Sequence, residues 1–273
     1  MSRAARVAVG VGLGLAAVGG GYAWYRWLRT RQLTWQRVLS DNIPVHSAYW
    51  RARRELPGEL VYIALGDSAA QGIGASRPAR SYVGVLARRI EDRTGRSVRV
   101  INLGISGATL QTALEKEAPR LLNIDASIVE NAIVTVSIGA NDVAAWDAAR
   151  FADQLDRLFT QLPTHAIVAD LPSFYFLPGD RKALEGGRLI RAAAARHGLR
   201  VVDLHETMKR EGLLGVTTQF AGDLFHPNDR GYDVWADAFE QAVFERVAQL
   251  AGSGSAASSP RSQSRASTNT SSA

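Results

Sequence analysis

Residues 60–68 read L-V-Y-I-A-L-G-D-S, a short apolar run that ends in glycine and is followed by two polar residues. A run of this length is typical of a strand that is buried on both faces. Asp67 and Ser68 then fall on a tight turn at the carboxyl end of that strand. Because ligands of open α/β sheets bind beyond the carboxyl ends of the strands, we expect this turn at the working edge of a sheet.

The same alternation of apolar strand and amphipathic helix continues to residue 250. Further strands are predicted at 98–103, 132–138, 166–171 and 199–204. Helices with one apolar face are predicted at 81–94, 110–122, 147–161, 181–197 and 231–250. Strands that alternate with helices form parallel βαβ units with right-handed crossovers. The predicted fold class is therefore α/β, with residues 57–250 as one three-layer α/β/α domain around a parallel sheet.

The positive charge of the chain lies at its two ends. The 273 residues carry a formal net charge of +6, with a pI of about 10.0. Residues 1–37 hold six arginines and residues 251–273 hold two, with no acid in either segment, which leaves residues 38–250 at −2. A nucleic-acid-binding domain needs a basic face on the folded body, so this distribution argues against nucleic acid as a partner. The lack of cysteine excludes a disulfide framework, a thiolate nucleophile and a cysteine metal site.

An uncharged segment of 19 residues, Val7–Tyr25, lies between arginines near the N-terminus. As a helix it would span about 28 Å, close to the thickness of a bilayer's hydrocarbon core. Its C-terminal end carries an aromatic cluster of the kind found at membrane interfaces: Tyr22, Trp24, Tyr25 and Trp27. We therefore expect residues 1–37 to form an apolar N-terminal helix that anchors the protein in a membrane.

A secretory signal peptide is the alternative for this segment, with small residues such as Ala17 and Gly19 near a cleavage point. Both alternatives make the protein membrane-anchored or exported, and the flanking arginines do not decide which side of the membrane the domain occupies. Residues 12–17 also fit a dinucleotide-binding fingerprint, but no strand precedes them, so we interpret them as part of the apolar span. Residues 38–56 are expected to be a linker or short helix, and the serine-rich residues 251–273 a disordered tail.

Candidate catalytic residues follow three of the predicted strands or precede the final predicted helix. Ser68 is a candidate nucleophile, and a serine hydroxyl needs a base within hydrogen-bond reach. Among the five histidines, only His226 has a carboxylate three residues earlier, Asp223, and a proline directly after it. Asp223 can hold the imidazole in the required tautomer. The backbone N–H groups of Ser68 and Gly107 and the side-chain amide of Asn141 can stabilise an oxyanion.

Four short blocks, in this order, resemble those of the SGNH, or GDSL-type, hydrolase family: Gly66-Asp67-Ser68, Gly107, Gly139-x-Asn141-Asp142 and Asp223-x-x-His226-Pro227. The resemblance covers roughly residues 57–250. It implies a flavodoxin-like fold and hydrolysis of carboxylic esters or thioesters without metal or other cofactor. It also implies that Ser68 is the nucleophile and His226 the base oriented by Asp223. The oxyanion donors it implies are Ser68, Gly107 and Asn141, with Gly104 as the alternative glycine.

The segment Leu171–Pro178 is the most apolar loop of the body and follows the fourth strand. We expect Phe174 and Phe176 to line an acyl-chain site or to touch a membrane, and packing on the domain's own core is the alternative. The leading prediction is a membrane-anchored or exported serine esterase or lipase that acts on a small-molecule or lipid ester. An acyltransferase using the same residues, and a non-enzymatic anchored binding domain, are the alternatives. The sequence does not identify the substrate or the oligomeric state.

Overall fold

The computed structural model describes residues 3–175 and 179–257, with side chains from residue 19 to residue 252. A five-stranded parallel sheet forms the centre of the domain, in the order β2-β1-β3-β4-β5. The strands are β1 (Leu60–Gly66), β2 (Val98–Asn102), β3 (Ala132–Ser137), β4 (Ile167–Ala169) and β5 (Arg200–Val202). This order is the flavodoxin-like one, so the predicted fold class is confirmed.

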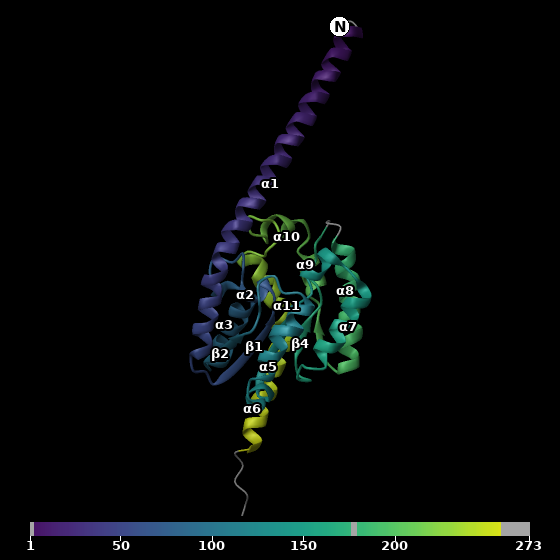
Figure 1. Cartoon of the computed structure of the whole chain (residues 1–273). Coiled ribbons are helices and arrows are strands. Elements are labelled where there is room, and N and C mark those ends of the chain that lie inside the picture. The colour runs from purple at the N-terminus through teal and green to yellow at the C-terminus, as the bar shows by residue number, and fades with distance from the viewer. Residues whose placement is uncertain (1–2, 176–178, 258–273) are drawn as a thin grey trace, which may run out of the picture.

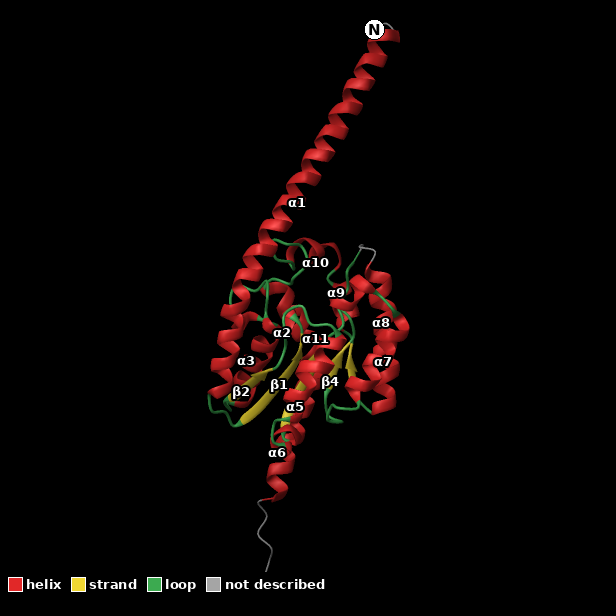
Figure 2. Ribbon diagram, in the orientation of Figure 1, coloured by secondary structure: helices red, strands yellow, loops and turns green. Residues whose placement is uncertain are grey.

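Helices cover both faces of the sheet (Figure 2). The α-helices are α1 (Arg3–Glu55), α2 (Ser68–Gln71), α3 (Tyr82–Thr94), α4 (Leu110–Thr112), α5 (Ala118–Leu122), α6 (Ala126–Glu130), α7 (Ala148–Phe159), α8 (Gly179–His197), α9 (Leu204–Arg210), α10 (Gly212–Thr218) and α11 (Asp229–Ala257). Two 3₁₀ turns, η1 (Pro78–Arg80) and η3 (Asn141–Ala145), and a π-helical turn, η2 (Ala113–Glu117), complete the structure.

The central strand β1 shows how the sequence produces the three layers. Tyr62 and Ala64 point into a core shared with α3 and α11, whereas Ile63 and Leu65 point into a second core shared with α5, α7 and α8. Successive side chains of a strand face opposite sides of a sheet, so a continuous apolar run fits a strand covered on both sides. The same register places the carboxyl ends of β1, β2 and β3 at one edge, directly before the predicted catalytic residues.

A single helix, α1, projects from the domain at its N-terminal end and packs against the domain along its second half (Figure 1). Three side chains of this half are buried: Leu39, His46 and Trp50. They are seven and four residues apart, so they lie on one face of the helix. His46 Nδ1 and Trp50 Nε1 donate to the carbonyl oxygen of Gln71 at 2.9 and 3.0 Å. The expected linker at residues 38–56 is therefore helical through Glu55 and held on the domain.

Both termini extend beyond what the structure describes. Among the residues with described side chains, no helix has a stretch long and apolar enough to cross a membrane. Most of the predicted span, residues 7–18, lies outside the part with described side chains, so the anchor stays a prediction. At the other end, residues 251–257 of the expected tail belong to α11, and residues 258–273 lie outside the described residues.

Candidate active site

A sharp turn at the end of β1 presents Ser68 at the edge of the sheet. Gly66 has a φ of 153°, and a Cβ there would lie 2.4 Å from the carbonyl oxygen of Ser137, so the position requires glycine. Asp67 caps α2, because its Oδ1 accepts from the backbone N–H of Ala69 at 2.9 Å. Ser68, the first residue of α2, is 6% exposed. The local sequence therefore fixes the hydroxyl at the carboxyl edge.

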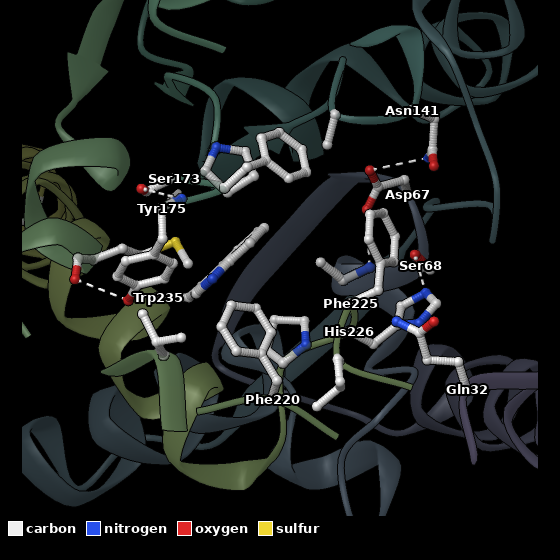
Figure 3. A pocket seen from close by; sticks show the side chains of 18 residues that line it. Gln32, Asp67, Ser68, Asn141, Ser173, Tyr175, Phe220, Phe225, His226 and Trp235 are labelled. Atoms are coloured by element: carbon white, nitrogen blue, oxygen red, sulfur yellow. Dashed lines mark hydrogen bonds between the residues drawn. The ribbon is translucent and has the colours of Figure 1, made fainter. Parts of the chain in front are cut away.

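His226 joins Ser68 to Asp223. Its Nε2 lies 3.0 Å from Ser68 Oγ (Figure 3). Its Nδ1 lies 2.6 Å from Asp223 Oδ2. The three residues that the sequence analysis combined are therefore brought into one hydrogen-bonded chain. A nucleophile, a base and an orienting carboxylate in this geometry can activate a serine hydroxyl.

Hydrogen bonds from backbone N–H groups to the Asp223 carboxylate fix the loop that carries Asp223 and His226. Asp223 Oδ1 accepts from the backbone N–H groups of Phe225 and His226, both at 3.1 Å. Burial alone would raise the pKa of Asp223, but the hydrogen bond and charge of His226, together with these N–H groups, hold that pKa below its usual value. Leu224, between these two residues, adopts a φ of 59°, in the left-handed region that residues other than glycine seldom occupy.

The candidate oxyanion donors lie on three neighbouring turns. Gly107, with a φ of 78°, follows β2, and Asn141 begins η3 after β3. Asn141 Nδ2 donates to the carbonyl oxygen of Ala108 at 2.9 Å and to Asp67 Oδ2 at a longer 3.3 Å. The alternative glycine, Gly104, already uses its N–H to donate to the Asn102 side chain at 3.0 Å. The N–H of Gly104 is therefore already engaged, which leaves Gly107 as the candidate glycine.

A buried glutamate lies beneath the nucleophile turn, and the sequence analysis missed it. Glu117 is fully buried on the π-helical turn η2, and its Oε2 accepts from the backbone N–H of Gly66 at 2.8 Å. Burial raises its pKa to about 8 against the opposing effect of that hydrogen bond, and burial raises the pKa of the nearby Asp67 to about 6. Glu117 can therefore fix Gly66 while remaining protonated at neutral pH.

An apolar cavity of about 300 Å³ opens beside Ser68. Ser68, Asn141 and His226 lie at one end of it (Figure 3). Its other walls are apolar and come from five parts of the fold: Phe174, Tyr175, Met208, Val216, Phe220, Leu224, Phe225 and Trp235. A cavity of this kind fits an apolar group next to a polar reaction centre.

Of the two predicted pocket residues, Phe174 lines the cavity and stacks on Phe225 with ring centroids 6.4 Å apart. Phe176 lies outside the described residues. Phe225 was missed although it stands between Asp223 and His226, because the sequence does not show which way a loop residue points. No group of acidic or histidine side chains suited to a metal ion occurs in the part of the chain that the structure describes.

Helix α1 also contributes to the site, which the sequence analysis did not predict. Gln32 lines the cavity on the same side as His226 (Figure 3). Three residues further along, Trp35 covers Gly222, where an added Cβ would lie 2.1 Å from the indole ring. Gly222 directly precedes Asp223, so the N-terminal helix supports the loop that carries the histidine and its carboxylate.

Comparisons with known proteins assign the chain to a family. The sequence profile of the GDSL-like lipase/acylhydrolase family matches residues 64–234. A GDSL-like esterase of Mycobacterium tuberculosis is 28% identical over 280 residues, which cover 90% of this chain and 87% of the relative.

Solved structures show the same fold. An α/β-hydrolase enzyme from the metagenome of Lake Arreo is 25% identical, with a TM-score of 0.54, over 70% of this chain and 97% of its own. A lipase/acylhydrolase of Enterococcus faecalis is 22% identical, with a TM-score of 0.55, over 68% of this chain and 96% of its own. The family profile covers more than half of the chain and contains the Ser68 turn. The chain therefore belongs to the GDSL-like lipase/acylhydrolase family and is a carboxylic ester hydrolase.

Proposed function

We propose that the enzyme hydrolyses carboxylic esters or thioesters through an acyl-enzyme on Ser68. The observation that carries this proposal is the position of His226, whose two ring nitrogens lie within hydrogen-bond distance of Ser68 Oγ and Asp223 Oδ2. The apolar cavity that begins at these residues supports an acyl group as the part of the substrate that is bound.

In the first half-reaction Ser68 Oγ attacks the acyl carbonyl carbon, and its proton passes to His226 Nε2. The oxyanion that forms accepts hydrogen bonds from the N–H groups of Ser68 and Gly107 and from the amide of Asn141. Collapse of the tetrahedral intermediate breaks the bond to the alcohol or thiol, which takes the proton from His226. Asp223 stabilises the imidazolium between these two steps.

In the second half-reaction water replaces the alcohol. His226 removes one proton from the water as its oxygen attacks the acyl carbon, and the same oxyanion site holds the second tetrahedral intermediate. Its collapse breaks the bond to Ser68 Oγ, which regains the proton from His226, and the acid is released. No other group is needed to balance the reaction.

The nucleophile is tested with the full-length protein, a fluorophosphonate probe and methylumbelliferyl acetate. Ser68→Ala removes the attacking oxygen, so we expect loss of labelling and of turnover. Ser127→Ala is the matched control, because Ser127 is exposed on α6, outside the cavity. Hydrolysis by Ser68→Ala at the rate of the control would refute the proposal.

We also propose that Phe174 favours apolar acyl groups, because its ring lines the cavity and stacks on Phe225. Phe174→Ala enlarges the cavity, so the preferred chain length of p-nitrophenyl esters is expected to increase relative to wild type. An unchanged chain-length profile would exclude Phe174 as a specificity residue.

The proposed location is a membrane, with residues 1–37 as an uncleaved anchor and the domain attached to it. The uncharged run at residues 7–25 and the arginines on both sides of it support this proposal. Removal of a signal peptide near Ala17 or Gly19 would still leave Gln32 and Trp35 in place, so the contacts of α1 with the site fit either fate of the segment. Fractionation of cells that express the full-length protein tests the location, and recovery in the soluble cell extract would contradict it.

A further inference from the structure

We propose that the acyl cavity opens toward the bilayer and takes the acyl chain of an ester lipid that resides in the membrane. This inference rests on the proposed ester hydrolysis at Ser68 and on the proposed anchor, and it adds the class of substrate. It follows from the direction of α1, from the side chains around the mouth of the cavity, and from the short distance between that mouth and the aromatic cluster of α1.

The projecting part of α1 and the catalytic edge of the sheet lie on the same side of the domain. Helix α1 ends at Glu55, close to the start of β1, and β1 then runs back to Ser68. Helix α1 and β1 are therefore antiparallel, and the N-terminal direction of the helix is the direction of the strand's carboxyl end. Figure 1 shows α1 leaving the domain on the side where α10 lies.

The domain begins directly after the aromatic cluster. Tyr22, Trp24, Tyr25 and Trp27 are 61%, 64%, 51% and 55% exposed, so the domain does not cover them. Leu28 and Gln32 are the first residues of the described helix that are partly buried. If aromatic rings at the end of an apolar span mark the level of the lipid headgroups, the domain lies directly on the membrane surface.

The distance from the cluster to the cavity is short and fixed. Gln32, which lines the cavity, follows Trp27 by five residues, and five residues of α-helix rise about 7.5 Å. Residues 27–32 contain neither glycine nor proline, so the helix has no obvious hinge there. If Trp27 lies at the level of the headgroups, this wall of the cavity lies within about 7.5 Å of that level along the helix axis.

The side of the domain that would face the lipids exposes large apolar side chains. Leu213 and Leu214 on α10 are 72% and 55% exposed. Leu224 and Phe225, which line the cavity, are 40% and 45% exposed. Leu213 and Leu214 do not line the cavity themselves, but they share α10 with Val216, which does. Large exposed apolar side chains near a cavity mark a surface that binds another apolar phase. An acyl chain that leaves the bilayer between these residues reaches Ser68 without crossing water.

The charge near this surface suits anionic lipids. Three arginines lie in or just after the aromatic cluster: Arg26, Arg29 and Arg31. The first acidic residue of the chain is Asp41. The guanidinium of Arg31 lies 5.5 Å from the centre of the Trp27 ring, which keeps charge and aromatic ring together. Basic residues at a membrane surface attract anionic headgroups. The occupant of this face is therefore a bilayer that contains anionic lipid.

The test uses the full-length protein in vesicles of equal parts phosphatidylglycerol and phosphatidylcholine. The chain has no cysteine, so Leu213→Cys and Leu122→Cys each accept one environment-sensitive fluorophore at a known position. Leu122 is 63% exposed on α5 and does not line the cavity, which makes it a matched control for Leu213. We expect nitroxide-labelled headgroups to quench the label at 213 and to leave the label at 122 unquenched. Equal quenching at the two positions would overturn the inference.

Activity gives a second readout. The rate on methylumbelliferyl oleate held in the vesicles is divided by the rate on methylumbelliferyl acetate in water. We expect Leu213→Asp to lower this ratio about tenfold, because a carboxylate opposes contact with an apolar, anionic surface, whereas Leu122→Asp leaves the ratio unchanged. A ratio equal in both variants would exclude a membrane-resident substrate while leaving ester hydrolysis intact. Acetate hydrolysis that survives Ser68→Ala would instead refute the proposed function, so the two failures are distinguishable.

Discussion

Replacing Glu117 by glutamine should make the stability of the protein much less sensitive to pH. Glu117 is fully buried and accepts from the N–H of Gly66 at 2.8 Å, and glutamine can accept the same hydrogen bond through its carbonyl oxygen. The difference between the two side chains is that glutamine cannot ionise. Any change in stability with pH that glutamine removes therefore reports the buried carboxyl group.

The size of the effect follows from the pKa. Burial raises the pKa of Glu117 from 4.5 to about 8, so the folded state holds the proton more tightly than the unfolded chain does. The free energy of unfolding is then highest at low pH, falls as pH rises from about 4.5 to about 8, and levels off above that. Since each pKa unit corresponds to about 1.4 kcal/mol, the loss across this window is of the order of 5 kcal/mol.

The assay is urea unfolding at about pH 5, 6.5 and 8, monitored by tryptophan fluorescence. At pH 5 we expect Glu117→Gln to be less stable than wild type by about 1 kcal/mol, because the amide brings a second N–H donor into a buried site. At pH 8 we expect it to be the more stable of the two by about 3 kcal/mol. Glu115→Gln, an exposed change on the same turn, should follow the wild-type profile. Parallel profiles for wild type and Glu117→Gln would refute a protonated Glu117.

Three further predictions concern catalysis and use methylumbelliferyl acetate as substrate. Asp223→Asn should lower kcat about 10³- to 10⁴-fold with little change in KM, because the imidazole loses its orienting carboxylate; a loss below tenfold would contradict this role. Gly222→Ala should lower kcat about tenfold, since its Cβ meets the Trp35 ring at 2.1 Å, and adding Trp35→Ala should restore most of the rate. No rescue in the double variant would mean that Trp35 does not position the loop. The value of kcat/KM should decline toward acid pH, because only neutral His226 accepts the proton of Ser68; a profile that is flat down to about pH 4 would exclude His226 as the base.

The strands and the grouping of the candidate catalytic residues could be predicted from the sequence because their signals are local. The run at residues 60–66 is apolar throughout, as a strand between two helical layers must be, and the structure places β1 there. Residues at the carboxyl ends of parallel strands meet at one edge, so Ser68 and Asn141 could be grouped before their distances were known. His226 follows no strand directly and was added because Asp223 stands three residues before it and Pro227 directly after it. The family resemblance rested on the same blocks.

The parts that the sequence did not reveal depend on contacts between distant segments. The burial of Glu117 depends on the π-helical turn beneath Gly66, and nothing in residues 113–117 distinguishes this glutamate from the exposed Glu115. Residues 38–56 contain enough charge to resemble a linker, yet Leu39, His46 and Trp50 share one helix face and dock on the domain. The helical turn around Gln32 lacks the regular spacing of apolar residues that would have predicted a face packed on the domain.

The continuity of α1 constrains how this protein can change length. Each residue inserted between Trp27 and Gln32 turns the aromatic cluster by about 100° relative to the domain and moves it about 1.5 Å along the axis. One inserted residue therefore rotates the rings away from their original side, and seven restore the direction but lift the domain by about 10 Å. No insertion in a straight helix can keep both the direction of the aromatic rings relative to the domain and their distance from the domain along the axis. On the proposed membrane anchoring, the four residues between Trp27 and Gln32 thus form a spacer of fixed length, in contrast to surface loops, where added residues are absorbed.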